Sequence, residues 1–285
     1  MGAVIVDGKS VGGKILEEVG IEANKLLGSG VEPHLSVVIV GDDPASHVYV
    51  RNKERACQKC GVKSTRIDMP VESTQDEILE VVRGLNSNTD VHGILVQSPT
   101  PNGIDELAIA SAIDPDKDVD GFHPINLGKI VQGNVSGLLP CTPSGVMHLL
   151  GVSGFDTIGK KAVVIGRSRI VGMPMALLLS QRGVDSTVTI AHSKTEELRA
   201  ICQDSDIVIA AIGKIHTVKS DWIKPGAFVA DVGISRTSDG KLSGDVDPSV
   251  ADVAGWITPV PGGVGPMTIA MLMRNTVRAA RNRAI

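Results

Sequence analysis

The stretch KAVVIGRSRIVGMPMALLLSQ, residues 161–181, decides the fold. Residues 162–165 form a short apolar run, rich in β-branched side chains, of the kind buried in a parallel sheet. Gly166 then opens a turn, and Gly172 with Pro174 leads into an apolar helical pattern. The order strand, glycine turn, helix predicts the first unit of a dinucleotide-binding fold, in which N–H groups at the helix N-terminus hold a pyrophosphate. The spacing is not G-x-G-x-x-G, so a turn whose glycines serve only tight geometry stays open at this point.

The next predicted strand, residues 187–191, indicates which dinucleotide would bind. It is followed by His192, Ser193 and Lys194, whereas enzymes that prefer NAD usually place Asp or Glu here to hold the ribose 2′-hydroxyl. An acidic side chain would repel a 2′-phosphate, but Arg167 and Ser193 can bind one. NADP is therefore the predicted cofactor.

Both halves of the chain read as α/β domains. Strands are predicted at 206–211 and 227–232, so residues 141–265 read β-α-β-α-β and form a Rossmann-type NADP-binding domain. Residues 1–140, the first domain in chain order, are also predicted to be an α/β domain. Its expected helices are 9–27, 44–59 and 74–85, its strands 35–40, 62–69 and 91–97, and a final helix is expected at 268–281.

Composition narrows the function classes. The 285 residues carry a net charge of −4 with charges interspersed, so nucleic acid or an anionic membrane is not the expected partner. No apolar run is long enough to span a membrane and no secretory signal is seen, so a cytoplasmic location is expected. Cys57 and Cys60 form a C-x-x-C at the end of a helical pattern, where a redox role is not favoured. The four cysteines are expected to be free thiols, and neither they nor the histidines show metal-ligand spacing.

Tyr49 and Lys53 lie four residues apart on the predicted helix 44–59, so their side chains share one face. That helix follows the carboxyl end of a strand, where open α/β sheets bind ligands. A lysine held in such a place loses hydration, its pKa falls, and it can serve as an acid or a base. Gln97, at the end of another strand, can hydrogen-bond the amine. On spacing alone, a solvated surface pair is an equally good interpretation.

Residues 114–137 have little periodicity and read as a long functional loop. It contains Asp118 and Asp120, but a magnesium site needs more oxygen ligands than this segment supplies. A carboxylate can also accept two parallel N–H bonds from a bicyclic amino-pyrimidinone ring. No Ser-His-Asp order or G-x-S-x-G turn is present, so serine hydrolase chemistry is not indicated.

Six motifs occur along the chain in a familiar order. They are S-x-x-Y-V-x-x-K-x-x-A-C (46–57), GILVQ-x-P-x-P (93–101), P-x-KDVDGFHP-x-N-x-G (115–128), PCTP-x-G (140–145), GRS-x-IVG-x-P (166–174) and TPVPGGVGPMT (258–268). Together they resemble the bifunctional methylenetetrahydrofolate dehydrogenase/methenyltetrahydrofolate cyclohydrolase family over essentially the whole length.

The resemblance implies an oxidoreductase and hydrolase of one-carbon metabolism. Such enzymes oxidise 5,10-methylenetetrahydrofolate with NADP and hydrolyse the methenyl product to 10-formyltetrahydrofolate, which purine biosynthesis uses, in a cleft between two domains. It also implies a homodimer and a C-terminal helix, residues 266–285, that packs back on the first domain.

The resemblance also implies a role for each matching residue. Lys53 would be the acid/base residue, Gln97 would hold it, Tyr49 would pack on the folate, and Asp120 would bind the pterin ring. The residues that would line the NADP site are Gly166, Arg167, Ser168, Ser193 and Ile234. The turn where folate and nicotinamide would meet contains Pro261, Gly262, Gly263 and Gly265.

Three positions depart from the family pattern. Ser98 and Thr100 replace leucines and make the expected folate wall more polar, and Met173 stands where several relatives have arginine. Two other functions remain as alternatives. An NADP dehydrogenase for another small substrate explains the Rossmann half only, and a silent folate- or nucleotide-binding protein leaves Lys53 without a purpose.

Overall fold

The computed structural model describes residues 2–283. The chain forms two compact units, each built from two separate segments. Residues 2–12 and 142–268 make the six-stranded unit, and residues 13–141 with 269–283 make the three-stranded unit. The predicted class, two α/β units of which one is Rossmann-type, is confirmed.

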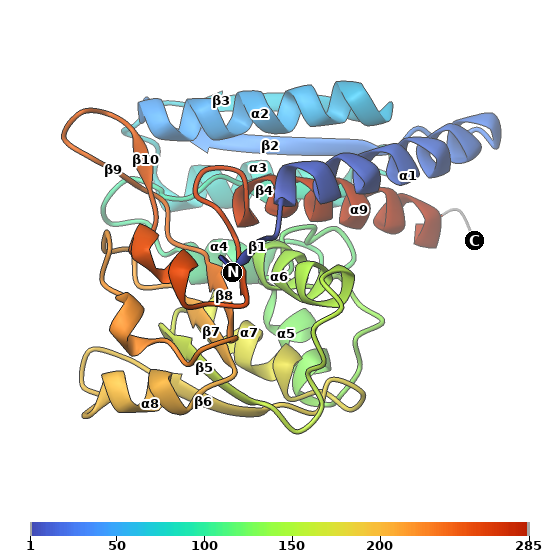
Figure 1. Cartoon of the computed structure of the whole chain (residues 1–285). Helices are drawn as coiled ribbons and strands as arrows, with labels where there is room; N and C mark the ends of the chain where they lie inside the picture. Colours follow the sequence, from blue (N-terminus) through green and yellow to red (C-terminus); the bar gives the residue numbers. More distant parts are fainter. Residues whose placement is uncertain (1, 284–285) are drawn as a thin grey trace. The chain divides into compact units, whose positions relative to one another are not determined.

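The elements of the chain are labelled in Figure 1. The helices are α1 (Gly8–Gly28), α2 (Pro44–Cys60), α3 (Gln75–Ser87), α4 (Glu106–Ala112), α5 (Pro124–Val131), α6 (Cys141–Val152), α7 (Gly172–Leu179), α8 (Leu198–Asp204) and α9 (Val264–Arg283), with short 3-10 turns η1 (Ser220–Trp222) and η2 (Pro248–Asp252). The strands are β1 (Val4–Ile5), β2 (His34–Val40), β3 (Lys63–Met69), β4 (Gly93–Val96), β5 (Lys161–Ile165), β6 (Thr187–Ala191), β7 (Ile207–Ala210), β8 (Phe228–Asp231), β9 (Ser235–Arg236), β10 (Leu242–Ser243) and β11 (Trp256–Ile257).

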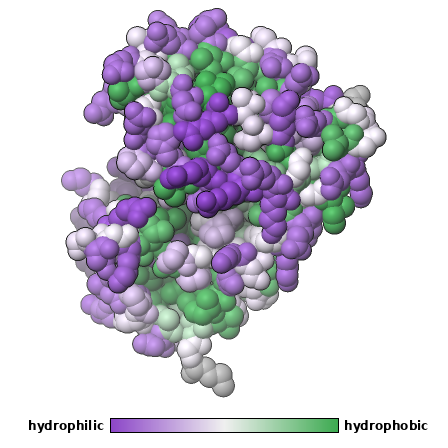
Figure 2. Space-filling model, turned by 90° about the horizontal axis from the view of Figure 1, so that it is seen from above, coloured by the Kyte–Doolittle hydropathy of each residue, from purple (hydrophilic) through white to green (hydrophobic). Residues whose placement is uncertain are grey.

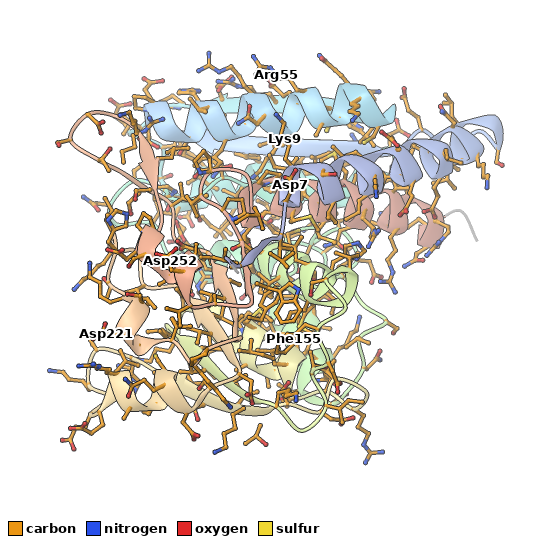
Figure 3. The ribbon with its side chains drawn as sticks, in the orientation of Figure 1. Asp7, Lys9, Arg55, Phe155, Asp221 and Asp252 are labelled. Carbon is orange, nitrogen blue, oxygen red and sulfur yellow. The ribbon has the colours of Figure 1, made fainter. Side chains whose placement is uncertain are left out.

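The main sheet of the six-stranded unit is parallel, with strand order β1-β11-β8-β7-β5-β6. Its central strands are apolar because both faces are covered, and Val163, Val208 and Val229 are fully buried in one core. Phe155 packs against Phe228 and Trp256, with ring centroids 5.7 and 5.3 Å away, and Figure 3 labels Phe155. Parallel strands place all their carboxyl ends at one edge, where the loops can gather around a ligand.

The three-stranded unit has the order β3-β2-β4, again parallel. The central strand β2 is buried at every position, whereas the edge strand β3 is polar and partly exposed. Helices α1 and α9 run side by side (Figure 1), and ion pairs Arg274–Glu18 and Arg281–Glu22 join them. The chain therefore returns to this unit with α9, after residues 142–268 of the six-stranded unit.

Helix boundaries follow local capping. The Asp43 carboxylate accepts the Ser46 N–H at the start of α2, and Gly61 ends that helix in the left-handed conformation. Asp7 accepts the N–H groups of Lys9 and Ser10 at the start of α1, where Figure 3 labels Asp7 and Lys9. Thr74 and Glu77 form a capping box at the start of α3.

The predicted elements differ from the structure in several places. The expected loop 114–137 contains the short helix α5, which His123 caps. The polar stretch after β8 contains the hairpin β9–β10. Residues 2–12 belong to the six-stranded unit, although the sequence assigned 1–140 to the first domain, because β1 pairs with β11 in register Val4↔Trp256.

The four cysteines are free and buried. Burial raises the pKa of Cys57 to about 12 and that of Cys60 to about 11. Since the thiolate is the reactive form, neither thiol is poised for redox chemistry near neutral pH. The C-x-x-C is therefore a packing feature of α2.

Hydrophilic and hydrophobic residues alternate over the face drawn in Figure 2, where purple side chains separate the green patches. Within residues 2–283, no helix has both the length and the apolar character needed to cross a bilayer.

Candidate active site

Lys53 and Gln97 meet in the three-stranded unit. The Lys53 ammonium donates a 2.9 Å hydrogen bond to Oε1 of Gln97. Gln97 directly follows β4 and its N–H bonds the Val38 carbonyl of β2, while α2 carries Lys53 back over the sheet after β2 ends. The chain order strand, helix and neighbouring strand thus brings the two side chains together, as the sequence predicted.

The Lys53 amine is out of water. The residue is only 9% exposed, and burial lowers the pKa of its amine, although the nearby Asp120 carboxylate opposes the shift. Burial likewise raises the pKa of Asp120, and Lys53 opposes that change. Desolvation therefore disfavours the charged form of both Lys53 and Asp120, while the opposite charge of the neighbour favours it. Residues that exchange protons in active sites are typically found in such an environment.

Cys141 is a third group beside this pair, and its thiol stays neutral. Burial and the Asp120 charge raise the pKa of Cys141 well above its ordinary value. Its Sγ donates to the Val119 carbonyl at 3.2 Å, and the Asn275 amide of α9 donates to the same carbonyl at 2.8 Å. These bonds hold the backbone next to Asp120. Sequence reasoning did not single out Cys141, although it lies in the PCTP motif.

The loop that carries Asp120 is fixed by Asp118. Its buried carboxylate accepts the backbone N–H groups of Gly121, Phe122 and His123 and the side-chain amide of Asn126. Gly121 has φ of +78°, and a Cβ there would lie 2.3 Å from the Leu139 carbonyl carbon. The two aspartates therefore differ in role. The Asp118 carboxylate bonds the backbone of the turn, whereas the Asp120 side chain is half-buried near Lys53.

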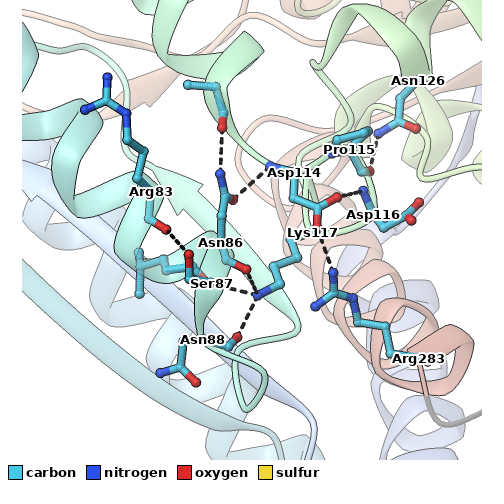
Figure 4. Close-up of polar contacts among 12 residues, drawn as sticks. Arg83, Asn86, Ser87, Asn88, Asp114, Pro115, Asp116, Lys117, Asn126 and Arg283 are labelled. Atoms are coloured by element: carbon cyan, nitrogen blue, oxygen red, sulfur yellow. Dashed lines mark hydrogen bonds and ion pairs between the residues drawn. The ribbon is translucent and has the colours of Figure 1, made fainter.

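Lys117 anchors the same loop from its other side (Figure 4). Its fully buried ammonium donates to the carbonyls of Leu85, Asn86 and Asn88 at 2.9, 2.8 and 2.7 Å, at the C-terminal end of α3. A cation is favourable there because the last carbonyls of a helix have no helical partners. The sequence predicted no role for Lys117, because its partners are backbone groups distant in the chain.

Tyr49 and the two polar departures lie near this cluster in the chain. Tyr49 is one turn before Lys53 on α2 and is 42% exposed, so its ring is available to a ligand. Ser98 accepts a bond from the Gln97 side chain through its carbonyl. The Thr100 N–H donates to the Glu106 carboxylate at 3.0 Å, so this polar residue is tied to α4.

In the six-stranded unit, the turn between β5 and α7 approaches its neighbours too closely for side chains. A Cβ on Gly166, whose φ is +134°, would lie 2.3 Å from the Ala211 carbonyl oxygen. A Cβ on Gly172 would lie 2.1 Å from the Gly166 oxygen. The Ser168 hydroxyl accepts the N–H groups of Val171 and Gly172 and shapes the turn. Arg167 is exposed at its tip.

Arg167 and Ser193 follow neighbouring strands. β5 and β6 pair in register Ile165↔Ala191, so the residues after each strand emerge at the same edge of the sheet. Ser193 is exposed, and residues 192–194 contain no carboxylate. A guanidinium and a hydroxyl that emerge together, with no carboxylate among residues 192–194, fit the 2′-phosphate of NADP.

Ile234 and the glycine-rich turn 261–265 also come together. Ile234 follows β8 and is 37% exposed, and a Cβ on Gly265 would lie 3.4 Å from its Cδ1. The turn is closed by the Gly263 N–H, which donates to the Pro259 carbonyl at 2.8 Å. An apolar side chain beside a close backbone turn suits the flat ring of a nicotinamide.

Comparison with known protein families covers both units. Residues 6–120 match the model for the tetrahydrofolate dehydrogenase/cyclohydrolase catalytic domain, and residues 140–284 match the model for the NAD(P)-binding domain of the same family.

The chain belongs to the tetrahydrofolate dehydrogenase/cyclohydrolase family. It is similar to the bifunctional protein FolD of Campylobacter concisus, with 52% identity over 97% of each chain. It is also similar to that of Acetivibrio thermocellus, with 51% identity over 100% of this chain and 99% of the other.

Solved structures of family members have the same fold. The FolD enzyme of Campylobacter jejuni superposes with a TM-score of 0.96 at 47% identity over 99% of both chains. The enzyme of Trypanosoma brucei, solved with NADP and an inhibitor, superposes with a TM-score of 0.93 at 39% identity over 99% of this chain and 98% of the other.

The close contacts of Gly172 in the turn between β5 and α7 predict how this tetrahydrofolate dehydrogenase/cyclohydrolase family member responds to a substitution there. Gly172→Ala places a methyl group against the Gly166 carbonyl, so the turn must shift, and we expect a stability loss on the order of 2 kcal/mol with weakened NADP binding. Thermal unfolding and NADPH fluorescence titration measure the two effects. Gly151→Ala in α6 is the control, because its Cβ meets nothing within 4 Å and alanine favours a helix. Equal behaviour of the two variants would contradict the prediction.

Proposed function

We propose that this chain is a bifunctional one-carbon enzyme. It oxidises 5,10-methylenetetrahydrofolate to the methenyl form with NADP, and it hydrolyses the methenyl form to 10-formyltetrahydrofolate. The observation that carries the proposal is the buried Lys53–Gln97 pair beside Asp120, in a chain whose other unit has an NADP-compatible turn. Similarity to enzymes of both activities supports it.

The three-stranded unit would hold the folate and perform the hydrolysis. We propose that Asp120 accepts paired N–H bonds from the pterin ring and that the Tyr49 ring packs on the folate. Lys53 removes a proton from the attacking water and returns one to the departing ring nitrogen. Gln97 supports this role, because its Oε1 orients the amine at 2.9 Å without adding a charge.

The six-stranded unit would hold the cofactor. Hydride acceptance is the chemistry that bound NADP supplies. We propose that Gly166 and Ser168 shape the pyrophosphate turn and that Arg167 with Ser193 binds the 2′-phosphate. The nicotinamide would rest against Ile234 and the turn of Pro261, Gly262, Gly263 and Gly265, where the substrate carbon must also be presented for hydride transfer.

The deciding test is a single absorbance assay. The purified protein is mixed with methylenetetrahydrofolate and NADP, and formation and decay of the methenyl chromophore are followed. We expect the methenyl chromophore to form and then to decay, and we expect faster formation with NADP than with NAD. Failure to form methenyl product from well-folded protein would overturn the dehydrogenase assignment, and failure to consume added methenyltetrahydrofolate would overturn the cyclohydrolase assignment.

Arg167→Ala should lower the preference for NADP. Removal of the guanidinium takes a charged partner from the 2′-phosphate, so we expect the KM for NADP to rise about tenfold or more while the KM for NAD changes little. Arg182→Ala, an exposed arginine after α7, is the matched control. If the unmodified protein used both cofactors equally well, or if Arg167→Ala left their ratio unchanged, this assignment would be wrong.

We further propose that the enzyme is a homodimer of the cytoplasm whose product serves purine biosynthesis. The family resemblance supports this proposal, and the interspersed charges with a net charge of −4 give no reason to expect a nucleic acid or membrane partner. Sedimentation equilibrium tests the oligomeric state, since a chain of 29.8 kDa should then sediment with twice that mass.

A further inference from the structure

Two buried aspartates of the six-stranded unit have no part in the function proposed so far. Asp231 ends β8 and Asp245 follows β10, and they are 4% and 0% exposed. Each carboxylate packs on a glycine that lies one or two residues from the other aspartate. A Cβ on Gly244 would lie 1.8 Å from Asp231 Oδ2, and a Cβ on Gly233 would lie 2.2 Å from Asp245 Cγ. The two segments therefore interlock, and only glycine fits at both crossing points.

The Asp245 carboxylate binds one turn of backbone. It accepts the successive N–H groups of Ile212, Gly213 and Lys214 at 2.6, 2.9 and 2.8 Å. These donors belong to the turn directly after β7, and three N–H groups pointing at one carboxylate fix the path of that turn. Because all three successive N–H groups bond one buried side chain, this turn is held firmly.

The Asp231 carboxylate binds two further segments. It accepts the N–H of Gly233 at 3.2 Å and those of Asp245 and Val246 at 2.9 and 3.0 Å. The first bond sets the chain direction immediately before Ile234. The other two fix the segment that carries Asp245. The pair therefore links the turn after β7, the turn after β8 and the end of the β9–β10 hairpin.

These turns border the proposed cofactor site. β5, β7 and β8 are consecutive neighbours in the sheet, so the turns that follow them lie along one edge. The Ala211 carbonyl, one residue before the Asp245-bound turn, is the atom that a Cβ on Gly166 would strike. At the other end, Ile234 lies beside Gly265. The carboxylate pair thus connects the pyrophosphate turn to the nicotinamide end.

We infer that Asp245 and Asp231 are positioning residues for NADP: their carboxylates hold the turns 212–214 and 233–234 in the shape that receives the cofactor. Neither needs to contact the cofactor, since both are occupied by backbone N–H groups. The inference rests on the proposed NADP-dependent function.

The first test is Asp245→Asn. Asparagine keeps the shape but replaces one acceptor oxygen by an NH₂ donor that faces backbone N–H groups, so the turn 212–214 must move. We expect the dissociation constant for NADPH, measured by fluorescence titration, to rise about tenfold or more. The KM for NADP should rise in parallel, and the KM for methylenetetrahydrofolate should stay unchanged. Hydrolysis of added methenyltetrahydrofolate, assayed without NADP, should also be unchanged. Asp252→Asn, at an exposed aspartate of η2 labelled in Figure 3, is the matched control and should bind NADPH normally.

A second variant, Gly213→Val, tests the inference if Asp245→Asn does not fold. Gly213 is exposed with φ of +73°, and a Cβ there meets nothing within 4 Å, so Gly213→Val strains the same turn while both aspartates stay in place. It should weaken NADPH binding and leave hydrolysis intact. Normal NADPH affinity in a folded Asp245→Asn variant overturns the inference, as does normal affinity in Gly213→Val if Asp245→Asn does not fold. Absence of NADPH binding by the unmodified protein would instead refute the proposed function, so the two failures are distinguishable.

Discussion

Lys53→Met is expected to abolish hydrolysis of methenyltetrahydrofolate while leaving a measurable share of the dehydrogenase reaction. Methionine keeps the length and apolar stem of the side chain but deletes the amine that bonds Gln97. Hydrolysis requires proton transfer from water and to a ring nitrogen, and a positioned acid/base residue contributes roughly 10²- to 10⁴-fold to such a step. Hydride transfer requires alignment of the two rings but no protein base. Methenyl product should therefore accumulate.

The measurement is methenyl absorbance after mixing the variant with substrate and NADP, with hydrolysis assayed separately. Lys59→Met is the matched control, because it changes an exposed lysine on the same helix. If Lys53 only bound the anionic tail of the substrate, both reactions would fall together through a higher KM. Full hydrolysis by Lys53→Met would refute the acid/base role outright.

Asp120→Asn is expected to weaken folate binding by roughly 10²-fold and to reduce both activities, with NADP affinity unchanged. The exchange replaces one acceptor of the paired bond by a donor, so an N–H group of the ring faces an N–H group of the protein. Because Asp118 and Lys117 anchor the loop through other atoms, the substitution leaves the backbone in place.

Calorimetric titration with a folate substrate or inhibitor measures this loss. Asp116→Asn, at an exposed position of the same loop, should bind normally and serves as the control. Unchanged folate affinity in Asp120→Asn would show that this carboxylate does not contact the ring.

Local patterns were sufficient to predict most of the fold. Strands β2, β5, β6, β7 and β8 appear in the sequence as apolar or β-branched runs, and Asp43, Thr74 and Gly61 mark helix ends through contacts made within a few residues. The Lys53–Gln97 contact was also predictable. A helix that follows one strand and a residue that ends the neighbouring strand are brought to the same edge by the parallel topology alone.

Features that depend on tertiary backbone contacts could not be predicted. Helix α5 has eight residues, too few for a clear period, and the β9–β10 hairpin is made of two-residue strands. Lys117 and Asp245 bond to backbone groups, which every residue has, so their sequence neighbours give no signal. The polar residues missed by sequence reasoning are those whose partners are main-chain atoms far along the chain.

The pairing of β1 with β11 determines when the six-stranded sheet can be completed during synthesis on the ribosome. Val4 cannot pair until Trp256 has been synthesised, so this edge of the sheet stays open until nearly the whole chain is made. The three-stranded unit cannot be completed early either, because the side chain of Asn275 near the C-terminus donates the hydrogen bonds to Val119 and Leu139 that support the loop of Asp120. Contacts this distant in sequence slow folding. During translation, both units therefore expose incomplete surfaces until the final helix emerges, and a nascent chain arrested before α9 is the form most in need of a chaperone.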